Sequence, residues 1–503
     1  MYFYTPRYFV LYIIFSIIPE WQCSHFVKST GDHCSRLVSN ENCKNSIIDE
    51  RYLLYDINPP EGFNLRRDVF LRVAILTKKL QKFGDWTLVL PPWTSLYHWR
   101  SSDAGDQYNI PWGKFFDVKS IEKFVPVIEF QDFIQERENK VIDEVYVLQH
   151  FKGAWENNDW KDKMDVEPCH EKFHYWLNDD GLFEGEFWDN DDLISAKKVQ
   201  CLSFQGSASY IIPLLVGGRK IGKIAWIIEP DPNAPRIVMV DRAEVLLHDE
   251  FGSVEYWRAR RSMRFASPLV MEATKFRKHF LNSSDEQDDT VRPEDWRNEK
   301  PNEVIDDGKM KNVFSKGGPY LCVHLRRQDF LWGRSSEVPS LKWAALQVLN
   351  HLKELKLFTV FIATDAPDKE VDEFRQYIGP KHNVVQWKPS MKLKKVYKDG
   401  GAAIIEQIIC SHARYFIGTH ESTYSFRIQE EREIMGFHPD TTFNRLCGGD
   451  IPTTNELTIK GKESHCERPS RWRIVFYVKN FVQQLQVTSS KPQTMTQVFS
   501  KRS

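Results

Sequence analysis

Residues 51–64 read Arg-Tyr-Leu-Leu-Tyr-Asp-Ile-Asn-Pro-Pro-Glu-Gly-Phe-Asn, and this stretch decides the predicted fold. The apolar run over 51–56 has the length of a buried strand. The two prolines after it stiffen the backbone, and Gly62 permits a sharp turn. Apolar side chains then recur at helical spacing over 68–80. Strand, turn and helix in this order predict the start of a βαβ unit.

The same alternation continues along the chain and predicts two α/β domains. Further strand-like runs of the first half lie at 86–90, 145–148, 225–228 and 237–240. In the second half strands are expected at 320–324, 358–362, 384–387 and 415–417, and helices at 340–352, 402–411 and 423–433. We therefore predict an α/β fold, with an N-terminal α/β domain over 45–255 and a C-terminal one over 256–480.

Two polar segments lack the periodicity of helices or strands. Residues 282–318 are rich in Asp, Glu, Lys, Pro and Gly and are expected to form a mobile loop. Residues 486–503 are polar and are expected to form a disordered tail. Asn282 opens the sequon Asn-Ser-Ser beside the charged stretch, so it is a predicted glycosylation site.

The composition excludes several classes of protein. The chain has 503 residues, with 68 Lys and Arg against 69 Asp and Glu, and a net charge of −1. Such a balance gives no bulk attraction to nucleic acid or to acidic membranes. No CxxC pair or other ligand cluster with metal-site spacing stands out, so no metal site is predicted.

The N-terminus indicates the secretory pathway. An apolar run over 8–18 follows Arg7, and it is shorter than the ~20 residues of a membrane-spanning helix. We predict a signal peptide over 1–23, with an uncleaved anchor as the alternative. After cleavage the protein is expected in the lumen of the endoplasmic reticulum, with the Golgi as an alternative, and without a membrane contact. The last four residues are not a KDEL-type signal, so retention needs another cause.

The cysteines fit an oxidising compartment. There are nine, and loss of Cys23 with the signal peptide leaves eight that can pair. Cys322 and Cys410 lie inside apolar runs and are expected to be buried free thiols. The pairing of Cys34 and Cys43 stays open.

Polar groups follow the predicted strands. Glu61 lies on the rigid turn after the first strand, where an α/β domain places catalytic groups; a turn glutamate in solvent is the alternative. Arg326 and Arg327 follow the strand that opens the second domain. An arginine there suggests a phosphorylated ligand, because its planar fork binds phosphate bidentately. A surface salt bridge is the alternative.

Two further motifs lie at expected helix starts. Ser422 and Thr423 lie where a strand leads into a helix, and such a start can cradle an anion. Helix capping by Ser422 has the same geometry. Asp399 precedes another helix, and its carboxylate can accept both hydrogen bonds from the N1–H and 2-amino edge of guanine. Simple capping explains Asp399 as well.

These segments occur together, in the same order, in one known family. The matching blocks are 51–67, 90–93, 146–149, 205–209, 241–244, 324–327, 340–341, 363–365, 397–401 and 425–433. Over roughly 51–473 the chain resembles the GDP-fucose protein O-fucosyltransferases that act on thrombospondin repeats. The resemblance implies a GT-B fold, in which two Rossmann-like domains face a central cleft. It also implies an inverting, metal-independent transfer of fucose from GDP-fucose to a Ser or Thr hydroxyl of a folded thrombospondin type 1 repeat. The enzyme is expected to be a monomer and to need no cofactor.

The resemblance also implies roles for single residues. Glu61 resembles the catalytic base, and Arg326 looks like the group that binds the β-phosphate. The residues implied to bind GDP-fucose are Pro60, Glu61, Gly62, Phe63, Asn64, His324, Leu325, Arg326, Asp399, Ser422, Thr423 and Tyr424. Tyr424 stands where the family has Phe, and residues 420–421 also differ from the family. The disulfide pairs that the resemblance implies are Cys169 with Cys201 and Cys447 with Cys466.

Two alternatives to this function stay open. One is the sister activity on EGF-like repeats. The other is a lumenal protein that binds folded repeats without turnover. Glu61 separates the second alternative from an enzyme, because a binding module needs no carboxylate on this rigid turn.

Overall fold

The protein was analysed as a computed structural model. It describes residues 50–449, apart from 95, 137–139, 152–160, 171–173, 186, 189–193, 222–224, 228–233, 300–313 and 443. The predicted signal peptide, the predicted tail and Cys466 lie outside the described residues. No described helix is both long enough and apolar enough to cross a membrane.

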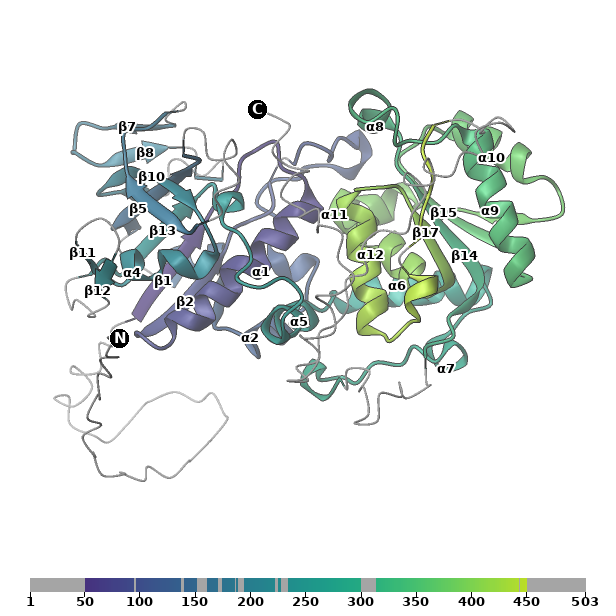
Figure 1. Ribbon diagram of the computed structural model, residues 1–503, viewed down its shortest axis with the longest axis horizontal. Helices are drawn as coiled ribbons and strands as arrows, with labels where there is room; N and C mark the ends of the chain where they lie inside the picture. Colours follow the sequence, from purple (N-terminus) through teal and green to yellow (C-terminus); the bar gives the residue numbers. More distant parts are fainter. Residues whose placement is uncertain are drawn as a thin grey trace, which may run out of the picture. The chain divides into compact units, whose positions relative to one another are not determined.

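The first half of the chain forms a seven-stranded sheet in the order β3-β2-β1-β13-β5-β10-β6 (Figure 1). Its strands are β1 Glu50–Tyr55, β2 Asp85–Leu90, β3 Val127–Glu129, β5 Glu144–Gln149, β6 Lys163–Val166, β10 Val199–Gln205 and β13 Ile237–Asp241. All neighbours are parallel except β10 and β6. Parallel strands are covered on both faces, which explains why β1 and β2 read as continuous apolar runs.

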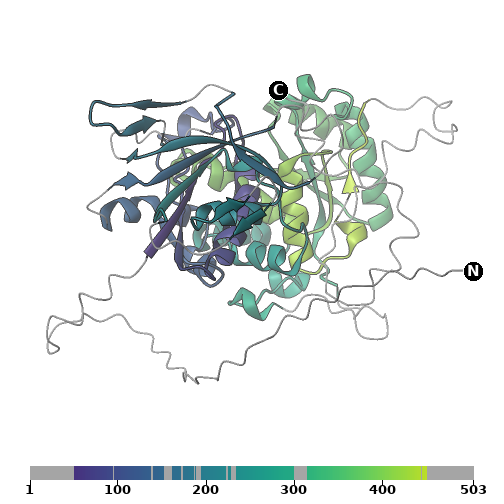
Figure 2. The same ribbon diagram turned by 60° about the vertical axis from the view of Figure 1, so that its left-hand side comes forward.

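Helices and two small sheets accompany this sheet (Figure 2). The helices are α1 Phe63–Leu80, α2 Val118–Glu122, α3 Phe130–Glu136, α4 Ile212–Leu215 and α5 Val254–Ser262. One small sheet contains β4 Val141–Ile142, β7 Tyr175–Leu177, β8 Phe183–Gly185 and β9 Ser195–Ala196. The strand predicted at 225–228 exists as β12 Ala225–Ile227, but it pairs only with β11 Arg219–Ile221 and stays outside the large sheet.

The second half forms a parallel sheet in the order β16-β15-β14-β17-β18. Its strands are β14 Gly318–Leu325, β15 Thr359–Thr364, β16 Asn383–Val385, β17 Ala413–Gly418 and β18 Asn444–Arg445. The helices are α6 Ser267–Phe280, α7 Asp285–Asp288, α8 Gln328–Gly333, α9 Leu341–Leu355, α10 Asp368–Ile378, α11 Met391–Ser411 and α12 Thr423–Ile434. Helices α9 and α10 cover one face, and α6, α11 and α12 lie on the other (Figure 1).

Short 3₁₀ helices complete the described chain. They are η2 Ser102–Ala104, η3 Trp112–Lys114, η4 Ala208–Ile211, η5 Ala243–Val245, η6 Trp296–Asn298 and η7 Pro439–Thr441. The fold is α/β, as the predicted GT-B class requires, with two separate sheets: the second is parallel throughout, and the first is parallel except for β6. Both sheets lie in one compact unit and share a hydrophobic core. The domain boundary at residue 255 therefore stays a prediction.

Two disulfides lie within the described residues. Cys169 pairs with Cys201, as the resemblance implies. Cys322 on β14 pairs with Cys410 on α11 across a Cα–Cα distance of 5.1 Å, so the prediction of free thiols is wrong. Both residues are fully buried, and an apolar sequence context is equally compatible with a buried thiol and a buried disulfide. Cys447 is disulfide-bonded as well.

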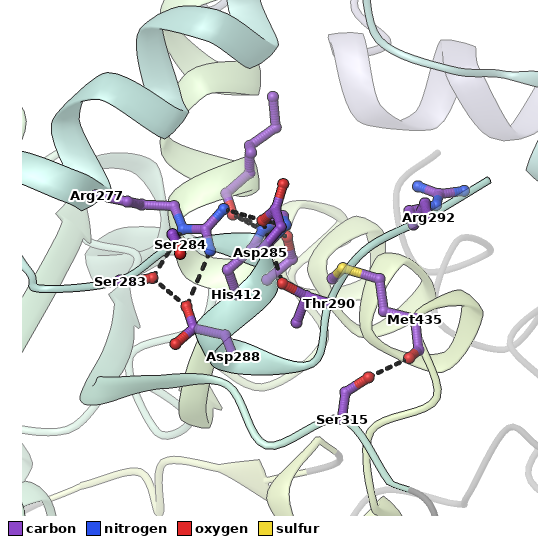
Figure 3. A network of polar contacts seen from close by, with 12 residues as sticks. Arg277, Ser283, Ser284, Asp285, Asp288, Thr290, Arg292, Ser315, His412 and Met435 are labelled. Carbon is purple, nitrogen blue, oxygen red and sulfur yellow. Dashed lines mark hydrogen bonds and ion pairs between the residues drawn. The ribbon is translucent and has the colours of Figure 1, made fainter. Parts of the chain in front are cut away.

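The loop predicted over 282–318 contains secondary structure, and its mobility stays a prediction. Its described first part, 282–299, includes α7 and is tied to α6 by ion pairs (Figure 3). The buried guanidinium of Arg277 donates to Asp285 at 2.7 Å and to Asp288 at 3.0 Å. Buried ion pairs leave no apolar periodicity, which is why the sequence pattern gave no sign of this attachment.

The predicted glycosylation site lies at the start of this segment. Asn282 is exposed, and its φ of 48° lies in the left-handed region that asparagine tolerates. Ser284, the hydroxyl residue of the sequon, is the N-cap of α7 and accepts from the N–H of Gln287 at 3.5 Å. Glycosylation itself stays a prediction.

Candidate active site

Glu61 lies on the turn between β1 and α1, and the turn is held from the side of the helix. The N–H of Glu61 donates to the carbonyl of Asn58 at 3.0 Å. Arg66, on the first turn of α1, donates through Nε to the carbonyl of Glu61 at 3.0 Å. Its Nη2 reaches the carbonyls of Ile57 and Asn58, each at 3.2 Å. A half-buried carboxylate is thus carried by a turn whose backbone carbonyls are bound by one guanidinium.

Helix α1 begins at Phe63, earlier than the predicted start at residue 68. The apolar pattern misses the first turn because it contains buried charged residues. Arg67 is fully buried and donates to Gln407 at 2.7 Å, and Gln407 donates to Asn64 at 2.8 Å. Asn64, implied to bind the donor, is therefore fixed by a helix of the second half.

A group of half-buried carboxyls lies next to this turn, at the ends of β1 and β13. Burial raises the pKa of Asp56 to about 8 and that of Glu244 to about 7. Burial also raises the pKa of Asp241, which accepts from the hydroxyl of Tyr175 at 3.1 Å. Glu244 accepts the N–H of Asn58 at 3.2 Å, so it also holds the turn of Glu61.

Arg326 follows β14 and lies between two carboxylates. Its Nη1 is 2.6 Å from Oδ2 of Asp365, and its Nη2 is 2.6 Å from Oδ1 of Asp329. The backbone N–H of Arg326 donates to the hydroxyl of Thr419 at 2.8 Å, which links β14 to the loop before α12. The guanidinium is held in place while part of it stays accessible, with 17% of the side chain exposed.

Arg327 has a different role from its neighbour. Its side chain is buried and donates to Glu370 at 2.7 Å and to the carbonyl of Pro339 at 2.9 Å. Its backbone N–H donates to Asp365 at 2.7 Å. Of the two arginines that the sequence offered as phosphate ligands, Arg327 is a structural anchor and Arg326 is the candidate.

One imidazole contacts both motifs. His98 is exposed, and its Nδ1 lies 3.4 Å from Nη2 of Arg326. A Cβ atom built on Gly62 would lie 3.2 Å from Cδ2 of His98 and 3.5 Å from Nε2. The turn that carries Glu61 and the arginine at the end of β14 are therefore separated by one side chain. Partial desolvation of the ring and the charge of Arg326 lower the pKa of His98.

His324 and Tyr424 form a stacked pair beside Arg326. Their ring centroids lie 4.3 Å apart, and the rings are inclined by 20°. Burial, helped by the charge of Arg326, lowers the pKa of His324 to about 3, so this ring is neutral. The hydroxyl of Tyr424 lies 3.2 Å from the carbonyl of Ala403 and 3.3 Å from Glu406. Burial raises the pKa of Glu406 to about 8. The hydroxyl that distinguishes Tyr424 from Phe thus has partners.

The start of α12 lies next to this pair. Ser422 is its N-cap by position, but the Ser422 side chain makes no capping hydrogen bond. Capping therefore does not explain the serine, while Thr423 begins the helix as predicted. Leu325 is buried at the end of β14 and contributes to the core between the sheet and α9.

Asp399 is paired with a segment of the first half. Its Oδ2 accepts from the N–H of Ser101 at 3.1 Å and from Nε2 of Gln107 at 3.0 Å. The N–H of Asp399 donates back to Oε1 of Gln107 at 3.0 Å. Helix α11 is interrupted at Lys398, whose φ of 60° and ψ of −179° are not helical, so Asp399 lies at the start of its second part, as predicted; Ser390 caps the first part by accepting from the N–H of Leu393. The carboxylate is thus oriented by contacts that no sequence motif indicated.

One group of described residues has the spacing of metal ligands. Side-chain atoms of Glu337, His420 and Glu421 lie within 4.8 Å of one another. The guanidinium of Arg334 binds both glutamates, at 3.0 Å for Glu337. Because an arginine already neutralises the pair, this group gives no support for a resident cation.

Comparison with known proteins decides the family. The family described as GDP-fucose protein O-fucosyltransferase matches residues 52–435. The chain belongs to this family. A protein from Homo sapiens named GDP-fucose protein O-fucosyltransferase 2 is 45% identical over 85% of this chain and 90% of its own length. One of the same name from Caenorhabditis elegans is 38% identical over 90% and 96%. Among solved structures, POFUT1 in complex with GDP-fucose is 17% identical, has a TM-score of 0.48, and matches over 78% of this chain and 97% of its own.

Several residues of this family member's site had no sequence signal. His98 follows the matching block at 90–93 inside an aromatic stretch, where nothing distinguishes it from a core residue. Gln107 binds Asp399, far along the chain, and lies in no matching block. Glu244 lies in the matching block at 241–244, but nothing local indicates that it accepts from Asn58. Long-range pairing of this kind is absent from local motifs.

Proposed function

We propose that the protein transfers fucose from GDP-fucose to a Ser or Thr hydroxyl of folded thrombospondin type 1 repeats, with inversion and without a metal ion. Membership of the fucosyltransferase family supports protein O-fucosylation by a glycosyltransferase. The proposal of an inverting transfer rests on one observation: His98 contacts both the turn that carries Glu61 and the guanidinium of Arg326. A base and a phosphate ligand from different sheets then flank one reaction centre.

Glu61 is the proposed general base. An inverting transfer needs a base on the face of the sugar opposite the diphosphate, and a carboxylate on a braced turn suits that role. Glu61 takes the proton of the acceptor hydroxyl while the oxygen of that hydroxyl bonds to the anomeric carbon of fucose. The bond from that carbon to the β-phosphate oxygen breaks, and GDP leaves with the electron pair.

Arg326 is proposed to stabilise the leaving diphosphate. Its guanidinium is fixed by Asp329 and Asp365, so it costs little reorganisation when charge grows on the β-phosphate. Ser422 and Thr423 at the start of α12 add a helix N-terminus, which favours an anion. An arginine and a helix start can neutralise the diphosphate, which supports transfer without magnesium.

The donor's base is proposed to lie at Asp399 and the His324–Tyr424 pair. The residues proposed around the donor are Pro60, Gly62, Phe63, Asn64, His324, Leu325, Asp399 and Tyr424. We also propose a monomer in the lumen of the endoplasmic reticulum, in keeping with the apolar N-terminal run and the described disulfides.

The test is a transfer assay with separate acceptors. Purified protein is incubated with GDP-fucose and EDTA, and with either a folded thrombospondin repeat or a folded EGF-like repeat. We expect fucose on the thrombospondin repeat, detected by mass spectrometry. Fucose on the EGF-like repeat alone contradicts the proposed acceptor. Loss of transfer in EDTA contradicts metal independence.

Substitution of the base provides the second test. Glu61→Gln keeps the shape of the side chain but removes its basicity, so transfer is expected to fall by about 10³-fold. Calorimetry should show GDP binding close to wild type, because the amide preserves the turn. Transfer near the wild-type rate would assign the base to another group. A protein that binds repeats without turnover would show no transfer in either the wild type or the variant.

A further inference from the structure

We infer that His98 is a further residue of the donor site, and that its Nε2–H donates to the oxygen between the fucose and the β-phosphate. The inference rests on the proposed function and names a contact within it. No motif or family block included His98.

The tautomer follows from the neighbouring arginine. The guanidinium of Arg326 can only donate, so Nδ1 of His98, at 3.4 Å, must accept. A neutral imidazole that accepts at Nδ1 carries its proton on Nε2. The charged groups that face the ring are Arg326, Arg100 and Asp329, and the net effect on the ring favours its neutral form.

The position follows from Gly62. The φ of Gly62 is −79°, which any residue adopts, so the backbone does not require glycine there. A Cβ at this position would approach Cδ2 of His98 to 3.2 Å, closer than nearly all side-chain contacts. A larger residue would therefore push the ring aside by a few tenths of an ångström, and the Nε2–Cδ2 edge of His98 lies against the turn that carries the proposed base.

These two contacts place the Nε2–H donor between the base and the phosphate ligand. The bond that breaks in the proposed reaction joins the anomeric carbon to the β-phosphate oxygen. That oxygen gains negative charge in the transition state, so a donor aimed at it contributes more to the rate than to the binding of GDP. Because His98 is exposed, its ring is accessible to bound GDP-fucose.

Steady-state kinetics of the full-length protein test the inference. His98→Ala is expected to lower kcat by on the order of 10²-fold while the Kd of GDP changes less than about threefold. His98→Gln should recover part of the loss, because its Nε2–H₂ can replace the imidazole donor. His279→Ala, which removes an exposed histidine of α6, is the matched control and should retain the wild-type kcat.

A double-mutant cycle isolates the contact. Gly62→Ala should displace His98 by a few tenths of an ångström and lower kcat by about tenfold. In the His98→Ala background the same substitution should have little further effect, because the ring that it displaces is gone. Independent effects of the two substitutions, or a kcat of His98→Ala within threefold of wild type, would overturn the inference.

Hydrolysis of GDP-fucose without an acceptor, followed on the same variants, separates the two proposals. A wild type that hydrolyses the donor but fucosylates neither repeat contradicts the proposed acceptor, and the effects on hydrolysis then decide the role of His98. A wild type that neither transfers nor hydrolyses overturns both.

Discussion

Replacing Cys322 and Cys410 by alanine is expected to destabilise the protein more than replacing Cys169 and Cys201. Both disulfides constrain the unfolded chain, and the entropy that a cross-link removes grows with the loop that it closes. The Cys322–Cys410 pair spans 88 residues, and the Cys169–Cys201 pair spans 32. The loop-closure relation gives about 4.6 kcal/mol for the longer loop and about 3.7 kcal/mol for the shorter one.

Urea unfolding of both double variants measures this difference. The expected loss in free energy of unfolding is larger for the Cys322–Cys410 variant by about 0.9 kcal/mol. Alanine also leaves a small cavity at the fully buried Cys322–Cys410 pair, whereas Cys169 is exposed, so the cavity increases the difference in the same direction. Equal slopes against urea show that the unfolded states are comparable.

Peptide mapping without reduction identifies the link directly, since it should recover one peptide from β14 joined to one from α11. Two unlinked peptides, or a Cys322–Cys410 variant as stable as wild type, would refute the reasoning. The earlier expectation of free thiols would then be correct.

Three further predictions concern single side chains. Tyr424→Phe keeps the ring that stacks on His324, so the affinity for GDP, measured by calorimetry, should stay within about threefold of wild type. The variant loses the hydrogen bonds of the hydroxyl to Ala403 and Glu406, so its free energy of unfolding should fall by about 1–3 kcal/mol. Burial raises the pKa of Asp56 from 3.8 to about 8, so the native state holds a proton that the unfolded chain has released, and stability falls as pH rises through this window. Asp56→Asn stays neutral, and its melting temperature relative to wild type should therefore increase from pH 5 to pH 8.5; a constant difference would contradict this. Arg327→Ala should lose about 3 kcal/mol in urea unfolding, because it removes a buried guanidinium that binds Glu370 and the carbonyl of Pro339. Arg326→Ala also loses ion pairs, to Asp329 and Asp365, so transfer is the readout that separates the two: it should be lost in Arg326→Ala and retained by the folded fraction of Arg327→Ala.

The sequence predicted the parts of the fold and site that depend on local pattern. The strand-turn-helix unit from residue 50 and the strand that ends at Arg326 could be derived because apolar runs and turn residues report local structure. Glu61 and Arg326 follow such strands, and ligands bind at the carboxyl ends of parallel strands, so both were predicted as candidate site residues. The pattern also offered Asp399 at a helix start, with capping as the alternative, and the family resemblance supplied the donor.

The features that the sequence missed depend on contacts between distant segments. The start of α1 was placed too late because Arg67 is buried by pairing with Gln407, and a buried charge interrupts an apolar pattern. The attachment of 282–299 through Arg277 was hidden for the same reason. His98 became a candidate only when its two neighbours, Gly62 and Arg326, were seen to share it.

The pairing of Asp399 with residues 101–107 has a consequence for natural variants. Lys398 donates to the carbonyl of Ala104 at 3.0 Å and Lys394 binds Asp103 at 2.9 Å, in addition to the bonds of Asp399 itself. The segment 101–107 contains no motif for binding GDP-fucose, yet it sets the orientation of the Asp399 carboxylate, which is proposed to select guanine. Variants in 101–107 are therefore expected to change nucleotide preference, and GDP against ADP is the comparison that detects them.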